Sequence, residues 1–337
     1  MIKEALAALI DKNDLTQIQM QSVFEEIMRG RLSPAQISAF LIALRMKGET
    51  AREITEAALA MRKFVKRINI KEDVVLDTCG TGGDIKHTFN ISTISALVAA
   101  GCGLVVAKHG NRAVSSLCGS ADLLEALGVN INIDEKKVEE CLKTVGIGFL
   151  FAQNLHPAMK YAAGVRKELG LRTIFNLLGP LTNPAFATHQ LLGVYDPKLL
   201  IVLAKVLANL GVKHGLVVHG LDGLDEITTT TFTKICELKN KKLRSYKISP
   251  SDFGIKKSRL KDLEGGSAQD NARITLEVLQ GKKGPKRDIV LLNSGCAIYT
   301  ADKAGSIKEG IELARQSIDS GSALRKLEEL RRVTNNR

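Results

Sequence analysis

Tryptophan is absent from this chain of 337 residues, and aromatic side chains make up only 4% of it, so the core must be mostly aliphatic. No C-x-x-C pair and no cysteine–histidine cluster with zinc spacing occurs. The six cysteines stand singly, as Cys79, Cys102, Cys118, Cys141, Cys236 and Cys296. A chain of this length can build a core without disulfides, so we expect free thiols and a cytoplasmic, reducing location.

Long hydrophobic segments are also missing. The longest apolar stretch, 94–107, is interrupted by Gly101 and Gly103 and is too short to span a bilayer. The first ten residues place Lys3 and Glu4 beside a short apolar run, which is not the pattern of a signal peptide or an anchor. We therefore expect no membrane association.

Acidic residues are outnumbered by basic ones, and the formal net charge is +12. Such a charge suits nucleic acid, an acidic surface or a small polyanionic substrate. Lysine and arginine gather in segments 239–247, 256–261 and 282–287, without a pattern of interleaved aromatics or a recognisable nucleic-acid motif. We interpret these segments as solvated surface and do not expect a nucleic-acid partner. A small polyanion is the better use of the positive potential.

The first seventy residues carry only helix signals. Three capping boxes follow one another: Thr16 with Gln19, Ser33 with Gln36, and Thr50 with Glu53. Pro34 suits a first helical position, and Gly30 and Gly48 suit helix ends. Because apolar residues recur at helical spacing between these signals, we predict a small domain of about four helices over residues 1–70.

From Val74 onward, short apolar runs alternate with helical patterns. The runs are 74–76, 104–107, 148–151 and 216–219, and the tail, 307–333, is again helical in pattern. This alternation is typical of an α/β domain with a central, largely parallel sheet, here over 71–337. Ligands bind such sheets at the carboxyl ends of the strands, so we expect the loops after these runs to converge on one site.

A glycine-rich turn follows the first of these runs. Its sequence is Cys79-Gly80-Thr81-Gly82-Gly83-Asp84, and a helix-like stretch begins near Asn90. Glycines allow positive φ and a close approach to a ligand, and the N–H groups of such a turn and of a helix start form an anion site. Neither the G-x-x-x-x-G-K-[ST] loop nor the G-x-G-x-x-G fingerprint is present. The turn therefore predicts phosphate binding.

Two further loops place polar chemistry at the same sheet edge. Segment 107–116 contains Lys108, His109, Asn111 and two serines, and its cation and hydroxyls suit phosphate oxygens. Segment 220–226 ends in Asp225-Glu226, whose carboxylates suit Mg²⁺ bridged to substrate phosphates. Taken alone, the first is also compatible with a polar surface loop and the second with an exposed acidic turn.

A fourth segment contains Arg166, which could pair with a carboxylate in bidentate fashion, and continues through 172–184 with two proline-fixed turns. Taken alone, Arg166 is also compatible with an ordinary position on a helix surface. No Ser-His-Asp or Cys-His arrangement can be defended, and Cys79 is a small residue of the glycine-rich turn rather than an evident nucleophile.

Together these segments resemble the anthranilate phosphoribosyltransferase family over nearly the whole chain. The resemblance is carried by segments 80–84, 90–93, 108–112, 115–116, 119–122, 172–184 and 223–226. One such motif would be weak, whereas seven in order are specific. The resemblance implies a homodimer formed through the small helical domain, which helices from about 158–184 rejoin. It also implies the second step of tryptophan synthesis from chorismate, in which phosphoribosyl pyrophosphate and anthranilate give N-(5-phosphoribosyl)anthranilate and pyrophosphate.

The resemblance also implies roles for individual residues. Phosphoribosyl pyrophosphate would be held by Gly80, Gly82, Gly83, Asp84, Thr88, Asn90, Ser92, Thr93, Lys108, Ser116 and Ser120. Anthranilate would be held or lined by Gly80, His109, Asn111, His156, Tyr161, Arg166 and Pro180. Mg²⁺, expected as two ions, would be bound by Ser92, Asp225 and Glu226. An aromatic amine is uncharged at neutral pH, so positioning and electrostatics would suffice without a covalent nucleophile.

Two alternatives from other classes stay open. A pyrimidine nucleoside phosphorylase-like enzyme would share the glycine-rich turn but lacks the Lys-His-Gly-Asn-Arg pattern of 108–112 and the Asn-Leu-Leu-Gly-Pro-Leu pattern of 176–181. A non-catalytic nucleic-acid-binding relative would use the +12 charge. The Asp225-Glu226 pair speaks against that second alternative, because an acidic pair gains nothing beside a phosphate backbone without metal.

Overall fold

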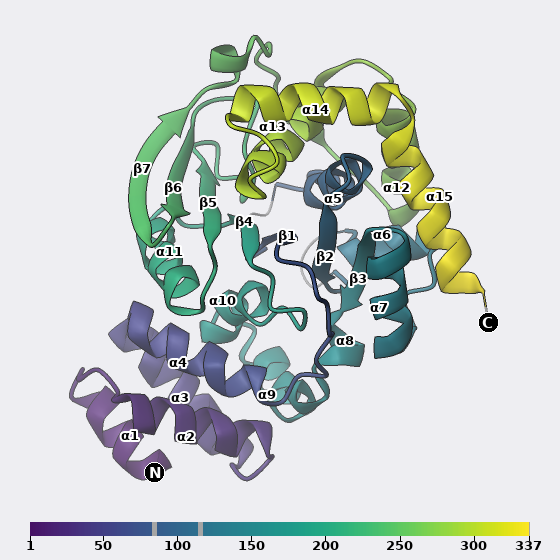
Figure 1. Ribbon diagram of the computed structural model, residues 1–337. Helices are drawn as coiled ribbons and strands as arrows, with labels where there is room; N and C mark the ends of the chain where they lie inside the picture. Colours follow the sequence, from purple (N-terminus) through teal and green to yellow (C-terminus); the bar gives the residue numbers. More distant parts are fainter. Residues whose placement is uncertain (83–85, 114–116, 337) are drawn as a thin grey trace.

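The computed structural model describes residues 1–82, 86–113 and 117–336, and the chain forms a helical bundle beside a larger α/β unit (Figure 1). The bundle begins with α1 (Ile2–Ile10), α2 (Gln17–Met28), α3 (Pro34–Lys47) and α4 (Ala51–Arg62). Each of the three predicted capping boxes is formed, at Thr16, Ser33 and Thr50. Pro34 begins α3, and Gly48 ends it with φ of 91°.

Seven strands form one sheet in the order β3-β2-β1-β4-β5-β6-β7. They are β1 (Val75–Gly80), β2 (Val105–Gly110), β3 (Ile147–Phe151), β4 (His189–Gly193), β5 (His214–Gly220), β6 (Thr233–Lys239) and β7 (Lys242–Ile248). Strands β1 to β5 are parallel, and β6 and β7 add an antiparallel hairpin. The predicted α/β class with a largely parallel sheet is confirmed, and all four predicted apolar runs lie in or overlap parallel strands.

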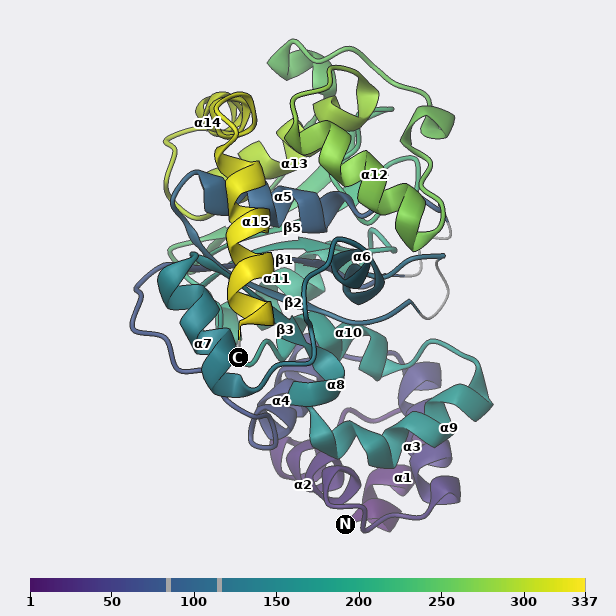
Figure 2. The ribbon, with the colours of Figure 1, turned by 90° about the vertical axis from the view of Figure 1, so that its right-hand side faces the viewer.

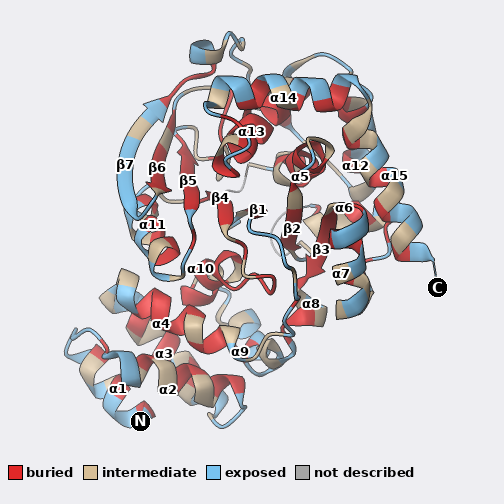
Figure 3. Cartoon of the chain, viewed as in Figure 1, coloured by how far each residue is buried: buried red, intermediate tan, exposed pale blue. Residues whose placement is uncertain are grey.

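Three strands were not predicted from the sequence. Strand β4 is short and begins with two polar residues, His189 and Gln190, both of which are buried. Strand β7 lies at the sheet edge and is exposed along most of its length (Figure 3). Its lysines belong to the basic segment 239–247, whose interpretation as solvated charge agrees with this exposure. Charged edge strands also discourage pairing with other chains.

Helices cover both faces of the sheet. After β1 the chain forms α5 (Ile91–Gly101), α6 (Ser120–Ala126), α7 (Glu135–Thr144), α8 (Ala152–Leu155), η1 (Pro157–Met159), α9 (Lys160–Leu169), α10 (Ile174–Leu181) and α11 (Leu199–Asn209). It ends with η2 (Pro250–Phe253), η3 (Leu260–Leu263), α12 (Ala268–Leu279), α13 (Pro285–Thr300), α14 (Ile307–Asp319) and α15 (Ser322–Asn335). Helices α5, α13 and α14 lie over one face, and α10, α11 and the bundle lie over the other (Figures 1 and 2).

Strand alternation divides the hydrophobic core between these two layers. Leu191 and Leu216 face the cluster that contains α5 and α13, whereas Leu192 and Val217 face the cluster that contains the bundle. Adjacent residues of a strand point to opposite faces, so a fully buried strand must satisfy both. The bundle and one face of the sheet therefore share a single core.

Helices from the middle of the chain pack on the N-terminal bundle. Helix α9 contacts α2 and α3, and α10 contacts α3 and α4. Ala162 of α9 and Leu178 of α10 are fully buried in the same cluster as the bundle. This packing lays α9 and α10 between the bundle and the carboxyl ends of the strands. Within the described ranges, no helix has the length and apolar character needed to cross a membrane.

Candidate active site

The glycine loop, residues 80–90, leaves the carboxyl end of β1 and leads into α5. Gly82 has φ of 68°, in the left-handed region that favours glycine. Gly80 gives space to the carboxylate, because a Cβ there would lie 2.4 Å from Asp225 Oδ2. Gly83 and Asp84 of the predicted phosphate site lie outside the described residues.

The carboxylate loop, residues 221–227, follows β5 and lies directly against the glycine loop. The Gly82 N–H donates to Asp225 Oδ2 at 2.8 Å. A Cβ on Gly193, the last residue of β4, would lie 1.5 Å from the Asp225 carbonyl oxygen. Two strand-end glycines thus provide the space in which the Asp225-Glu226 turn sits beside the predicted phosphate site.

Lys108 is buried beneath these loops and is only 3% exposed. Its ammonium donates to the Thr78 carbonyl oxygen and, at 3.3 Å, to Ser92 Oγ. Burial lowers the pKa of Lys108, and the Asp77 and Glu226 carboxylates oppose that shift. Lys108, Ser92 and Glu226 therefore share one neighbourhood, which links the predicted phosphate and metal residues.

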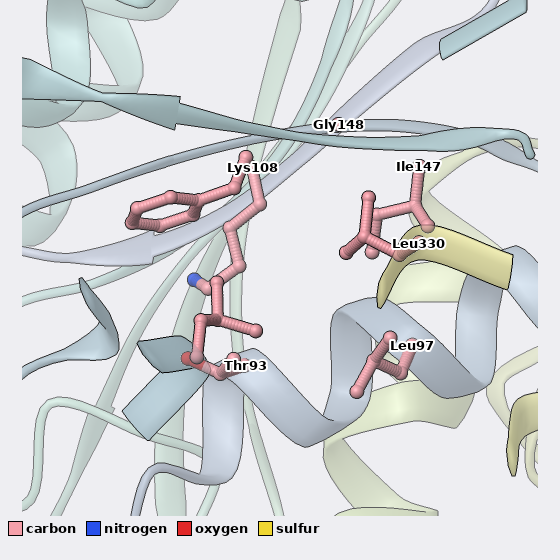
Figure 4. A pocket seen from close by; sticks show the side chains of 8 residues that line it. Thr93, Leu97, Lys108, Ile147, Gly148 and Leu330 are labelled. Atoms are coloured by element: carbon pink, nitrogen blue, oxygen red, sulfur yellow. The ribbon is translucent and has the colours of Figure 1, made fainter. Parts of the chain in front are cut away.

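Thr93, in the first turn of α5, also faces this region. Figure 4 shows Thr93 and Lys108 at one narrow cavity of about 10 Å³, whose other labelled lining residues are Leu97, Ile147, Gly148 and Leu330. The Thr93 hydroxyl is buried and has no hydrogen-bond partner among the described residues. The cavity is apolar on its remaining sides and belongs to the core between α5 and the sheet.

The oxygen donors here fit Mg²⁺. Asp225 and Glu226 would supply carboxylates and Ser92 a hydroxyl, and such hard ligands suit this ion when substrate phosphates and water complete its shell. Over the described part of the chain, no three His, Cys, Asp or Glu side chains gather closely enough to hold a metal by themselves.

Two histidines form a buried pair on the bundle side of the strand ends. His109 Nδ1 lies 3.1 Å from the Gly179 carbonyl oxygen, and His109 Nε2 lies 3.1 Å from His156 Nε2. The carbonyl requires an Nδ1–H donor, so neutral His109 accepts at Nε2 from His156. Burial lowers the pKa of both imidazoles, that of His156 to about 4. The pair is therefore uncharged at neutral pH.

The end of α10 is connected to the sheet beside this pair. The Pro180 carbonyl oxygen accepts from Gln190 Nε2 at 2.7 Å. The buried Asp77 carboxylate accepts from the backbone N–H of His109 at 3.1 Å and from Gln190 Nε2 at 3.4 Å. These bonds hold His109 and Pro180, two predicted anthranilate-lining residues, in one rigid unit.

Arg166 and Tyr161 lie on α9, between this unit and the bundle. The Arg166 guanidinium stacks over the Phe175 ring at 5.4 Å, and burial lowers its pKa. Arg166 is therefore half-buried rather than an ordinary surface residue. Tyr161 is more exposed and lies against the bundle, because a Cβ on Gly30 would come within 2.6 Å of its ring.

The loop after β2 is held by its own polar groups. Asn111 is exposed, and its Oδ1 accepts from the Arg112 N–H at 2.8 Å and from Gln153 Nε2 at 3.4 Å. Ser120, at the start of α6, donates to the Asn111 carbonyl oxygen at 3.3 Å. Arg112 is paired with Asp122 and Glu125. Ser116 of the predicted phosphate site lies outside the described residues.

Asn90 and Thr88 end the glycine loop. Asn90 Nδ2 donates to the Cys118 carbonyl oxygen at 3.0 Å, and its Oδ1 accepts from Asn271 Nδ2 at 2.9 Å. Thr88 forms an isolated β-bridge with Glu264. Both ends of the Asn90 amide are thus engaged within the protein, and its predicted contact with phosphoribosyl pyrophosphate stays a prediction.

Four residues that hydrogen-bond to the loops around the candidate site were missed from the sequence: Asp77, Gln190, Asn271 and Asn293. Asn293 of α13 is fully buried, and its amide bonds both the N–H and the carbonyl of Ile227, beside Glu226. A signal was available for Asp77, because a carboxylate stands inside an apolar strand run. The other three make contacts that no local pattern reveals.

Two family models match the chain. The helical bundle domain of a glycosyl transferase family matches residues 3–65, and the a/b domain of a glycosyl transferase family matches residues 72–324. Their order agrees with a helical bundle followed by an α/β sheet that carries a phosphate-type loop. The chain therefore belongs to the glycosyl transferase family and is an enzyme of that class.

Individual relatives narrow this class. The anthranilate phosphoribosyltransferase of Clostridium kluyveri is 55% identical over 99% of this chain and 100% of its own length. The crystal structure of that enzyme from Thermus thermophilus is 43% identical with a TM-score of 0.94, over 98% of this chain and 99% of that chain.

The Saccharomyces cerevisiae enzyme has been solved in two complexes that match 99% of this chain and 97% of its own. In the complex with PRPP and Mg it is 31% identical with a TM-score of 0.92. In the complex with 4-fluoroanthranilate it is 30% identical with a TM-score of 0.89. Within the glycosyl transferase family, the chain is grouped with the anthranilate phosphoribosyltransferases, and the resemblance found in the sequence is confirmed.

The histidine pair predicts a pH-dependent stability. The unfolded chain has an ordinary histidine pKa near 6.5, whereas burial lowers that of folded His156 to about 4. As pH falls below 6.5 the unfolded state binds protons first, so stability present at neutral pH is lost, by about 2 kcal/mol at about pH 5 for this group. Thermal unfolding of wild type and His156→Gln across this range measures the effect. The variant should lose less stability, and equal losses would contradict the assignment.

Proposed function

We propose that this chain transfers the 5-phosphoribosyl group from phosphoribosyl pyrophosphate to the amino group of anthranilate. The observation that supports this function most directly is the hydrogen bond from the Gly82 N–H to Asp225 Oδ2. This bond joins the glycine loop, which we propose for phosphate, and the carboxylate loop, which we propose for Mg²⁺, into one site. The relatives support the substrates, since homologous enzymes were solved with PRPP and Mg and with 4-fluoroanthranilate.

Phosphoribosyl pyrophosphate would bind across the glycine loop, the start of α5 and the loop after β2. The proposed residues are Gly80, Gly82, Gly83, Asp84, Thr88, Asn90, Ser92, Thr93, Lys108, Ser116 and Ser120. Support comes from the left-handed Gly82 and the buried Lys108 ammonium. Backbone N–H groups and a cation in a desolvated pocket attract phosphate strongly.

Mg²⁺ would be held by Ser92, Asp225 and Glu226, and we propose two ions per site. When bound, the ions would neutralise the charge that develops on the leaving pyrophosphate. Asp225 also accepts from Gly82, so its carboxylate aligns the glycine loop with the metal-binding residues. Lys108 donates to Ser92 and thereby orients the hydroxyl of the third ligand.

Anthranilate would bind between α9, the end of α10 and the histidine pair. Arg166 would hold its carboxylate, Asn111 would bind a polar group, and Gly80, His109, His156, Tyr161 and Pro180 would line its path. The neutral pair presents no charge to the aromatic ring, and Arg166 is desolvated enough to favour an anionic partner. This half of the site lies beside the bundle.

The reaction breaks the bond between the anomeric carbon and pyrophosphate and forms a bond from that carbon to the anthranilate nitrogen, whose proton is lost to solvent. The amine already has a free lone pair, so no covalent intermediate is required. Burial keeps the Cys79 thiol neutral by raising its pKa, which agrees with its exclusion as a nucleophile. Catalysis then depends on positioning and on stabilising the leaving group.

Anthranilate fluorescence tests this function directly. Purified protein with phosphoribosyl pyrophosphate and Mg²⁺ should cause a loss of signal over time, and EDTA should abolish that loss. A folded protein that causes no loss would overturn the proposed function. Phosphorolysis of thymidine or uridine, and salt-sensitive DNA binding, would then test the two alternatives from the sequence.

Replacing Arg166 by alanine should raise the KM for anthranilate by roughly tenfold to a hundredfold. This factor corresponds to the binding free energy that a hydrogen bond to a charged group contributes. The KM for phosphoribosyl pyrophosphate should change by less than about twofold. Lys167→Ala, an exposed neighbour on the same helix, is the matched control. An unchanged anthranilate KM in Arg166→Ala would remove this residue from the binding site.

Assembly and location complete the proposal. We propose a homodimer through the bundle, which exposes the apolar side chains of Met1, Ile10, Ile18 and Met46. Sedimentation of the purified chain measures its mass.

All six cysteines are free thiols, which supports a cytoplasmic location. We also propose residues 1–70, rejoined by helices within 158–184, as one domain and 71–337 as the other.

A further inference from the structure

Asn90 occupies the residue before α5 but does not cap that helix. Asparagine is among the residues preferred at this position, because its side-chain oxygen accepts from a backbone N–H of the first turn. The Asn90 side chain makes no such bond. The start of α5 is therefore not covered by the side chain best placed to cover it.

Two partners draw the Asn90 amide away from the helix. Its Nδ2 donates to the Cys118 carbonyl oxygen at 3.0 Å, and its Oδ1, the atom that would cap α5, accepts from Asn271 Nδ2 at 2.9 Å. The N–H groups of Ile91 and Thr93 already donate to the carbonyl oxygens of Phe89 and Asn90. The bond to Asn271 thus uses the acceptor that would otherwise compete with an anion for the Ser92 N–H.

Asn271 is itself held rigidly. It lies in the first turns of α12 and is only 2% exposed. Its Oδ1 accepts from the Gly266 N–H at 2.9 Å, so its Nδ2 is oriented toward Asn90. A Cβ on Gly265 would lie 2.7 Å from Asn271 Oδ1, so the backbone beside this amide has room only for glycine.

The segment that carries this amide also runs along the glycine loop. The Phe89 N–H donates to the Leu263 carbonyl oxygen at 3.3 Å, and the Gly265 N–H donates to the His87 carbonyl oxygen at 2.9 Å. Asn271 and the backbone of residues 263–266 together hold residues 87–90 in place.

We propose that Asn271 is a positioning residue for phosphoribosyl pyrophosphate. By engaging Asn90 Oδ1, it keeps the start of α5 open to the anionic substrate and ties the glycine loop to the loop that ends at Cys118. Asn271 does not touch the substrate and acts only through Asn90. This role rests on the proposed function, since it requires phosphate to bind at the start of α5.

Steady-state kinetics of Asn271→Ala and Asn271→Asp test this role. Both variants remove the donor to Asn90, and Asn271→Asp keeps an acceptor for Gly266. We expect the KM for phosphoribosyl pyrophosphate to rise about fivefold to tenfold in both variants. This factor corresponds to the free energy that a side-chain helix cap contributes. The KM for anthranilate and kcat should stay within about twofold.

Ser317→Ala is the matched structural control. Ser317 is buried on α14 and donates to the Val98 carbonyl oxygen at 2.9 Å, at the opposite end of the same α5 helix. Its removal should lower the melting temperature and leave both KM values unchanged. If Asn271 variants behaved like Ser317→Ala, or raised both KM values equally, the role would be purely structural and the inference would fail.

A double-mutant cycle separates action through Asn90 from a general effect. In an Asn90→Ala background no side chain is left to cap α5, so adding Asn271→Ala or Asn271→Asp should not change the phosphoribosyl pyrophosphate KM further. Additive increases would overturn the inference. An inactive wild type would instead overturn the proposed function, so the two failures are distinguishable.

Discussion

Replacing Asp225 by asparagine together with Glu226 by glutamine should reduce kcat by roughly a hundredfold to a thousandfold, and should change how the rate depends on Mg²⁺. The loss corresponds to the several kcal/mol that preorganised charge contributes to a transition state. Both substitutions preserve side-chain size and remove only charge, so the Gly82 N–H keeps an oxygen partner at Asp225. Turnover measured over a Mg²⁺ titration gives both quantities.

Asp222→Asn is the control for this double variant. Asp222 lies in the same loop, but its carboxylate accepts from the hydroxyls of Thr228 and Thr230. It should therefore leave the Mg²⁺ dependence unchanged. A wild-type Mg²⁺ titration in the Asp225/Glu226 double variant would refute the metal assignment.

Adding one methyl group by Gly193→Ala should reduce activity more than adding one at any other glycine of the site. Its Cβ would lie 1.5 Å from the Asp225 carbonyl oxygen, a separation that no side chain can relieve because the neighbour is backbone. The carboxylate loop must move away from the strand ends, which separates Asp225 from Gly82. We expect kcat/KM to fall at least a hundredfold, since displacements of about 1 Å in a site can cost this much.

Gly215→Ala provides the comparison. Gly215 lies in the neighbouring strand β5, and its Cβ would meet the flexible Leu207 side chain at 3.1 Å. Activity should stay within about threefold there, because a side chain can shift by a few tenths of an ångström. If both variants had equal activity and equal melting temperatures, the close approach of Asp225 to Gly193 would not matter for function.

Local rules account for what was correct in the sequence-based prediction. The capping boxes at Thr16, Ser33 and Thr50 each join residues three apart, so their formation is decided within one helical turn. The apolar runs near Val75, Val105, Ile147 and Leu216 became buried parallel strands because such strands must be hydrophobic on both faces.

The errors have a physical reason as well. Strand β4 contains Gln190, whose amide is satisfied by the Pro180 carbonyl and the Asp77 carboxylate, and neither partner lies in β4 itself. The hairpin of β6 and β7 is charged along its exposed edge, so its strand character is hidden by surface lysines. In both cases, contacts with residues distant in the sequence stabilise a strand in a segment that is polar by its own pattern.

Sequence by itself determined the chemical groups of the proposed site: glycines where the backbone must turn or approach closely, hydroxyls and a lysine that we propose for phosphate, and two carboxylates that we propose for a metal. Tertiary structure alone decided which of these groups meet. Gly82 and Asp225 are 143 residues apart, and Asn90 and Asn271 are 181 apart. Such contacts depend on the order of strands in the sheet and on how α12 and α13 pack over α5. These are properties of the whole folded chain, and no local window of residues contains them.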